Sequence, residues 1–271
     1  MKRRLGSMPT PHGCSRRSRA EANRPVMLRD LFSCGACGNQ VDCALLDAGA
    51  EFPHKSGLQI RQEEFRAGAP IAIDGDCLLA VKSGVVKSVC RDAHGHNRVV
   101  AFSFPGDLFG LEAMTDAAHA ELLHGASVSM TTVCRMRLSP DAARRASPHF
   151  CARLSAELAA RIRDNFQHRQ IVAAAAPVRM AHWLMQCLRA MQGQSAAQGA
   201  ILPGMARADI ASYLHLRVET VSRVLSEFRK NGWVRGPLHR LEVRDAEALA
   251  LLARGMGGHP DPARPQQVMH G

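Results

Sequence analysis

The cysteines are the residues of this chain whose spacing most clearly suggests chemistry. Cys34, Cys37 and Cys43 form a C-x2-C-x5-C pattern within the glycine-rich stretch SCGACGNQVDC, and Cys134 lies far downstream in TTVCRMRL. Three thiolates on a loop and one on a strand can surround a soft metal ion or an iron–sulfur cluster. From these residues alone, a zinc site, a redox disulfide and an iron–sulfur cluster are equally compatible with the pattern.

A second set of residues has the spacing needed to read DNA bases. Residues 207–228 read RADIASYLHLRVETVSRVLSEF, and Glu219, Ser222 and Arg223 lie at i, i+3 and i+4 of a predicted helix. They therefore share one helix face. Arginine can donate two hydrogen bonds to guanine, and glutamate can accept one from cytosine. The apolar residues of the stretch are spaced for two short helices: Ile210, Leu214, Leu216, Val218, Val221, Leu225 and Phe228.

The segment before these helices has the pattern of a small β-structure followed by a long helix. From about Gly57 to Leu138, short apolar runs alternate with glycine- and aspartate-rich turns, which predicts antiparallel strands closed into a roll. The clearest runs are Cys77–Val81, Val85–Val89 and Val99–Phe104. After Ser139, apolar residues recur every four positions, which predicts a helix that packs on its own domain or on a second copy. They are Phe150, Leu154, Leu158, Ile162 and Phe166.

The remaining C-terminal patterns complete a helical domain with a hairpin. Pro177 is placed to open a further helix that ends near Gln192, and a turn at His215 separates the two short helices. Trp233–Val234 and Leu241–Val243 suit the strands of a hairpin wing. The predicted fold class is therefore α+β, with an N-terminal antiparallel β-roll, a long helix and a C-terminal winged helix-turn-helix.

We expect five segments along the chain. They are a disordered basic extension (1–33), a cysteine loop with the β-roll sensor domain (34–140), a dimerisation helix (141–172), a winged helix-turn-helix domain (173–245), and a helix end with a flexible tail (246–271). The net charge is +11, and acidic residues outnumber basic ones only in the roll segment, which favours a polyanionic partner for the basic parts. No apolar run reaches the roughly 18 residues of a membrane span. We expect a cytoplasmic protein whose nine cysteines are reduced.

The helix-turn-helix segment resembles that of the CRP/FNR regulators, and VETVSR is close to the form found in the FNR branch. The resemblance implies a transcription regulator rather than an enzyme. It also implies that Glu219, Ser222 and Arg223 read TTGAT-type half-sites of palindromic double-stranded DNA. His215 stands where these turns usually carry glycine, and histidine tolerates a left-handed backbone better than most residues.

The cysteine pattern also resembles the FNR branch, which carries C-x2-C-x5-C before its roll and a fourth ligand late in the roll. The resemblance spans residues 34–245 and implies that Cys34, Cys37, Cys43 and Cys134 hold a [4Fe-4S] cluster, which oxygen converts to [2Fe-2S]. The alternative is a regulator of the same fold that uses zinc or a thiol/disulfide switch. Four other cysteines are expected to pack in the core: Cys77, Cys90, Cys151 and Cys187.

The resemblance further implies a homodimer that contacts RNA polymerase, here through the 91–97 hairpin. The expected dimer-interface residues on the long helix are Leu154, Leu158, Arg161, Ile162 and Asp164. Asp164 aligns with an acidic residue whose charge opposes pairing, and Arg161 is placed to form a salt bridge with it. A bound cyclic nucleotide is not expected, because no arginine between Arg98 and Arg135 is available to pair with its phosphate.

Overall fold

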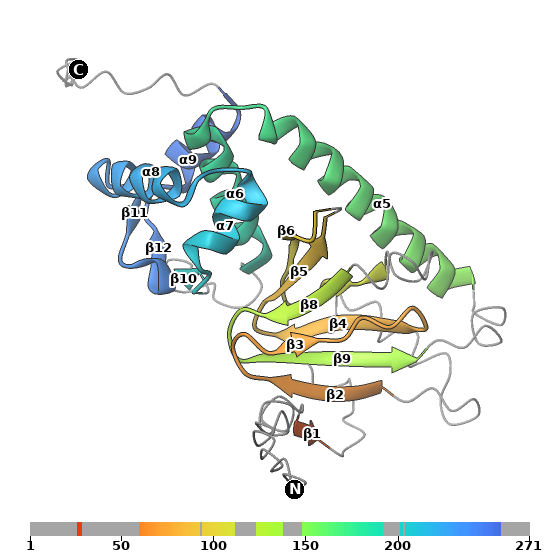
Figure 1. Ribbon diagram of the computed structural model, residues 1–271. Coiled ribbons are helices and arrows are strands. Elements are labelled where there is room, and N and C mark those ends of the chain that lie inside the picture. Colours follow the sequence, from red (N-terminus) through yellow and green to blue (C-terminus); the bar gives the residue numbers. More distant parts are fainter. Residues whose placement is uncertain are drawn as a thin grey trace, which may run out of the picture.

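The computed structural model describes residues 26–28, 60–92, 94–111, 123–137, 148–191, 201–202 and 204–255. Figure 1 shows a β-roll at one end, a helical C-terminal part at the other, and the long helix α5 running from the first to the second. Antiparallel sheets, a long helix and a C-terminal helix-turn-helix confirm the predicted α+β fold class. Within these ranges, no helix has the length and apolar character needed to cross a membrane.

The described strands of the roll form two sheets. One sheet has the order β1-β2-β9-β4-β7 and the other β3-β8-β5-β6, with every pairing antiparallel. The strands are β1 (Val26–Leu28), β2 (Ile60–Phe65), β3 (Pro70–Ile71), β4 (Cys77–Ser83), β5 (Val86–Arg91), β6 (Asn97–Ser103), β7 (Leu108–Phe109), β8 (Leu123–Ser127) and β9 (Thr131–Arg137).

Strand β4, which lies between β9 and β7, shows how the roll is held together. Cys77–Val81 is an unbroken apolar run, and side chains alternate between the two faces of a strand. Leu79 and Val81 therefore lie in one apolar cluster with residues of the other sheet, while Leu78 and Ala80 lie in a second cluster. This second cluster, which we call the outer cluster, comprises Leu78, Ala80, Leu108, Leu111, Met136 and Phe150, with Ile60, Cys134 and Leu154 packed against it.

The second half of the chain is mainly helical. Its elements are α5 (Pro148–Val172), α6 (Ala176–Met191), β10 (Ile201–Leu202), α7 (Arg207–Leu214), α8 (Val218–Lys230), β11 (Val234–Arg235), the 3-10 turn η3 (Leu238–Arg240), β12 (Leu241–Val243) and α9 (Ala246–Ala253). A core formed by α6 to α9 and the hairpin extends to Val85 and Phe104 of the roll. The two parts of the molecule therefore share buried apolar side chains.

Two expectations differ from the structure. Val26–Leu28 forms β1 and pairs with β2, although the sequence suggested an unstructured segment there. Cys77 and Cys187 are buried as predicted, but Cys90 is half-buried and Cys151 is exposed. Core packing was the wrong prediction for Cys151, because it lies on a face of α5 that no other described element covers.

Candidate DNA-binding site

The turn between α7 and α8 is a tight one that depends on a single unusual backbone conformation. His215 follows α7 with φ 54° and ψ 44°, in the left-handed region, as predicted from its place in the turn. The Leu216 N–H donates to the Ala211 carbonyl at 2.9 Å, so the end of α7 is closed by its own backbone. Such a turn fixes the angle between α7 and α8.

Arg179 of α6 reinforces this turn, and sequence reasoning did not identify it. Its Nη1 donates to the carbonyls of Leu214 at 3.1 Å and His215 at 3.2 Å, and its Nε donates to the Ala174 carbonyl at 2.7 Å. One guanidinium therefore joins the α5–α6 linker to the end of α7. No sequence pattern signals this role, because the residues that Arg179 joins contribute only backbone carbonyls.

Helix α8 has one buried side and one exposed side. Val221, Val224, Leu225 and Phe228 are buried. On the other side, Glu219 and Arg223 are exposed and Ser222 is half-buried. Within the described part of the chain, Glu219 and Arg223 have no hydrogen-bond or ion-pair partner. Both charged groups are therefore available to an external partner.

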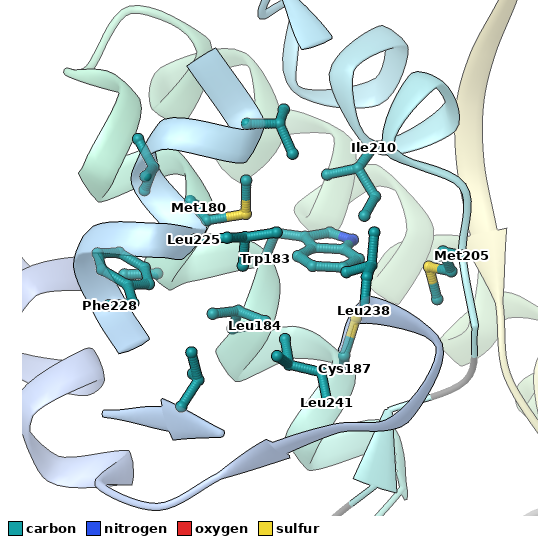
Figure 2. Close-up of a cluster of buried hydrophobic side chains, with 14 of the residues drawn as sticks. Met180, Trp183, Leu184, Cys187, Met205, Ile210, Leu225, Phe228, Leu238 and Leu241 are labelled. Carbon is teal, nitrogen blue, oxygen red and sulfur yellow. The ribbon is translucent and has the colours of Figure 1, made fainter. Parts of the chain in front are cut away.

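The core beneath α8 is shown in Figure 2. Trp183, Leu184 and Cys187 of α6 lie among Ile210 of α7, Leu225 of α8 and side chains of the wing. Burial raises the pKa of the Cys187 thiol above its ordinary value, so this cysteine is an apolar packing residue. Because α7 and α8 share this core with α6, the three helices form one rigid unit.

The predicted hairpin is present and is tied to α8. β11 and β12 pair antiparallel, with Val234 opposite Val243, and β10 adds a third strand. Gly236 turns the hairpin with φ 87°, and a Cβ there would lie 2.6 Å from the Arg240 carbonyl oxygen, so only glycine fits. Arg229 Nε donates to the Gly236 carbonyl at 2.9 Å, which joins α8 to the hairpin.

Exposed basic side chains are found on α8, at the start of α7 and on the hairpin. The exposed ones on this unit include Arg207, Arg217, Arg223, Lys230, Arg235 and Arg240. Arginine and lysine around a reading helix neutralise DNA phosphates, while residues on the helix itself reach the base edges. Two helices at a tight turn, a hairpin beside them and a basic surface define a winged helix-turn-helix DNA-binding protein.

Comparison with known proteins agrees with this class and names the family. The family model of the Crp-like helix-turn-helix domain matches residues 178–252. The transcriptional activator Anr of Pseudomonas protegens is 27% identical over 206 residues, covering 74% of this chain and 82% of that protein. The fumarate and nitrate reduction regulatory protein of Salmonella typhi is 26% identical over 201 residues, covering 73% and 78%.

Solved structures agree as well. FixK2 from Bradyrhizobium japonicum has a TM-score of 0.61 at 25% identity, covering 71% of this chain and 96% of that one. A CRP/FNR family regulator of Thermus thermophilus has a TM-score of 0.55 at 20% identity, covering 72% and 100%. The chain is a DNA-binding transcription regulator of the CRP/FNR family.

Of the four predicted cluster ligands, Cys134 is the one that the structure describes. Cys34, Cys37 and Cys43 lie outside the described residues. Cys134 is half-buried on β9 and packs against the outer cluster. No group of three histidine, cysteine or acidic residues suited to a metal occurs in the described ranges.

The register of the sheet brings the N-terminal chain close to Cys134. Cys134 pairs with Gln62 on β2, and Gln62 pairs with Leu28 on β1. Two strand spacings separate Leu28 from Cys134, about 10 Å. The six residues from Leu28 to Cys34 can span about 20 Å when extended. The first cysteine of the motif is thus within reach of Cys134.

The five predicted interface residues do not share one side of α5. Leu158, Ile162 and Asp164 are exposed, with exposed fractions of 41% and 70% for the two apolar side chains. Leu154 instead packs on the outer cluster. Arg161 pairs with Glu157 at 3.8 Å, whereas Asp164 lies 4.0 Å from Arg163, so the expected Arg161–Asp164 salt bridge is absent from this structure.

The geometry of a helix explains this difference. Residues four apart are separated by 400°, so a four-residue repeat drifts by about 40° per step. Along α5 the repeat begins at buried Phe150, passes half-buried Leu154 and reaches exposed Ile162 and Phe166. The N-terminal part of the stripe therefore packs on the roll, and the C-terminal part points away from it. Phe166, which is 64% exposed, belongs with the outward residues although it was not among the predicted interface residues.

Proposed function

We propose that this protein is an oxygen-responsive transcription regulator whose activity depends on an iron–sulfur cluster held by Cys34, Cys37, Cys43 and Cys134. The observation that supports the proposal is the sheet register that puts Leu28, six residues before Cys34 in the chain, about 10 Å from Cys134. It is supported by similarity to regulators named for anaerobic control, among them the Anaerobic regulatory protein of Haemophilus influenzae, which is 24% identical over 199 residues.

The position of Cys134 would couple a metal ligand at this residue to α5. The side chains beside it in the outer cluster include Phe150 and Leu154, which belong to the first turns of α5. A bound [4Fe-4S] cluster would supply a group that oxygen converts to [2Fe-2S]. That conversion would remove a restraint on these residues. Holding Cys134 and the N-terminal loop together would keep the base of α5 fixed against the roll.

The exposed part of α5 is the proposed dimer interface. Leu158, Ile162 and Phe166 expose large apolar surfaces, which monomeric proteins rarely leave in a contiguous stripe. Asp164 is also exposed but lies about 160° around α5 from Ile162, on the side that lines the cavity towards the roll, and its carboxylate is the charge that we propose opposes pairing. A stable base of α5 would favour the paired arrangement over this repulsion, whereas loss of the cluster would favour the monomer.

Dimer formation matters because the proposed target is a palindrome. Two copies of α8 would read TTGAT-type half-sites through Glu219, Ser222 and Arg223, one helical turn apart. A monomer contacts only one half-site and loses the gain in affinity that linked binding provides.

The 91–97 hairpin is the proposed contact with RNA polymerase. Asp92 Oδ1 accepts hydrogen bonds from the backbone N–H groups of His94 and His96, both at 2.9 Å, so the turn is preformed. Both histidines are exposed at its tip. These contacts lower the pKa of Asp92, which keeps its carboxylate ionised.

The test is metal analysis of protein purified without oxygen, with a visible spectrum recorded as air is admitted. About four irons and four sulfides per chain, with absorbance that bleaches in air, are expected. Cys134→Ser should lose the iron, and Cys90→Ser, on a strand of the other sheet, is the matched control and should retain it. Stoichiometric zinc, or protein without metal, would refute the cluster and leave a zinc site or a thiol switch as the sensing chemistry.

A further inference from the structure

Helix α7 is attached to the roll by a charged contact between residues far apart in sequence. Lys87 Nζ on β5 donates to both carboxylate oxygens of Asp209 in the first turn of α7, at 2.7 and 2.8 Å. The side chains are only 22% and 19% exposed. An ion pair that is largely removed from water is screened less by salt than a surface pair, and losing one partner leaves a charge poorly solvated.

A second polar contact lies beside the first. β6 is an edge strand of its sheet, and an edge strand presents backbone N–H groups that no neighbouring strand pairs. The Val99 N–H of β6 donates to Ser212 Oγ of α7 at 3.0 Å. Figure 1 shows α7 lying beside β5 and β6, so the helix covers this edge. We call the two contacts the roll–α7 clamp.

Apolar packing at this junction is incomplete. Val85 and Phe104 of the roll join the helical core, but an open cavity of about 380 Å³ lies between the roll and the helices, with Phe102, Asp107, Arg161, His168, Trp183 and Tyr213 among its lining residues. Since the α5–α6 link is only residues 173–175, a hinge there would let the DNA-binding unit swing unless directional contacts held it.

The geometry points to Lys87 and Asp209 as positioning residues for DNA recognition: their ion pair holds α7 on the roll and thereby sets the direction of α8 relative to α5. α8 follows α7 rigidly through the His215 turn and the shared core, and α5 carries the proposed dimer contacts. A dimer reads a palindrome only when both copies of α8 are held at the half-site spacing. The inference rests on the DNA-binding function and on the proposed dimer.

The test compares three variants of the full chain, prepared without oxygen: Lys87→Glu, Asp209→Lys, and the charge swap that combines Lys87→Asp with Asp209→Lys. Arg137→Glu is the control, because it makes the same charge change at an exposed pair within the roll, where Arg137 lies 3.0 Å from Asp76. The DNA probes are a palindrome selected by the wild-type protein from random duplexes and a duplex that carries one half of it. Hydrogen–deuterium exchange on β6 and α7, without DNA, reports the clamp directly.

Each single variant is expected to exchange faster at β6 and α7 and to lose about tenfold or more in affinity for the palindrome, with little change for the half-site. The charge swap should restore both readouts, and Arg137→Glu should alter neither. Unchanged exchange, unchanged palindrome affinity or an equal loss on both probes would overturn the positioning role. If the wild type shows no preference for the palindrome over its half, the proposed dimeric recognition fails instead. The exchange data then still decide whether the ion pair holds the junction.

Discussion

Helices α5 and α8 use their apolar residues in opposite ways. α8 buries four residues in 13, and its outward side is charged. α5 buries only Phe150 in 25 residues and exposes Leu158, Ile162 and Phe166. One chain completes the packing of α8 but not that of α5. A helix that leaves its apolar stripe uncovered depends on another surface for its stability. This difference suits α8 to DNA binding and α5 to the proposed dimer contact.

The largest effect is expected from a charge placed on the uncovered stripe of α5. Ile162→Glu would bring an unpaired carboxylate into the proposed interface, and a buried charge without a partner costs several kcal/mol. Dimerisation should weaken by about 100-fold or more, measured by analytical ultracentrifugation of anaerobic protein. Ala156→Glu is the matched control, because it adds the same charge at an exposed position on a different side of α5. An equal effect of both variants would contradict the assignment of the interface.

The corresponding change in α8 should damage the fold rather than assembly. Leu225 is fully buried, and truncating such a residue leaves a cavity. Leu225→Ala is expected to lower the free energy of unfolding by about 2–5 kcal/mol in urea denaturation. Ser226→Ala, at the adjacent exposed position, should change it by no more than about 0.5 kcal/mol. An effect well below this range would mean that Leu225 does not belong to the core that packs α8 within one chain.

The outward side of α8 should affect sequence preference and leave the fold intact. Arg223 is exposed and has no partner in the described part of the chain. Arg223→Ala is expected to cost about 1–3 kcal/mol of operator binding, since a bidentate contact to guanine contributes that much discrimination. Fluorescence anisotropy against single-base operator variants is the measurement. If the ranking of those variants is unchanged, Arg223 contacts phosphate and does not read bases.

The different success of sequence reasoning on the two helices has a physical origin. The α7–α8 pattern is local, because turn, buried side and exposed side are all encoded within residues 207–228, and even the left-handed His215 follows from its place in the motif. On α5 the sequence predicted the apolar stripe but not the surface that each of its residues faces, because the stripe winds around the helix. Leu154 and Arg161 therefore face the roll, where the sequence suggested a partner chain.

Contacts between distant segments were also beyond sequence reasoning. Lys87 and Asp209 are 122 positions apart, and neither belongs to a recognisable motif. Arg179 acts on backbone carbonyls, which any residue provides. The placement of Leu28 two strands from Cys134 depends on strand register, which is set by the pairing of whole strands. The motif residues could therefore be named in advance, whereas the contacts that orient them required the structure.

The smallest expected effect concerns Asp107, which lines the same cavity as Arg161 on the inward side of α5. Burial raises the pKa of Asp107 from 3.8 to about 6, against the opposing attraction of Arg161. The unfolded chain ionises this carboxyl more easily than the folded one. Asp107 therefore reduces stability progressively as pH rises from about 4 to about 6, and by a constant amount above that.

Asp107→Asn should thus stabilise the protein at neutral pH and have little effect near pH 4. The amide oxygen can still accept the Phe104 N–H, which donates to Asp107 at 2.8 Å, but the amide loses the attraction to Arg161. The pKa shift corresponds to a free-energy cost of roughly 3 kcal/mol at neutral pH. Because the amide loses the attraction to Arg161, we expect the free energy of unfolding to rise by only about 1 kcal/mol. Urea denaturation at about pH 4 and about pH 7.5 measures it. A larger loss at about pH 7.5 than at about pH 4 would mean that the carboxylate's contacts outweigh its desolvation, and that the inner side of α5 is held by charge as well as by packing.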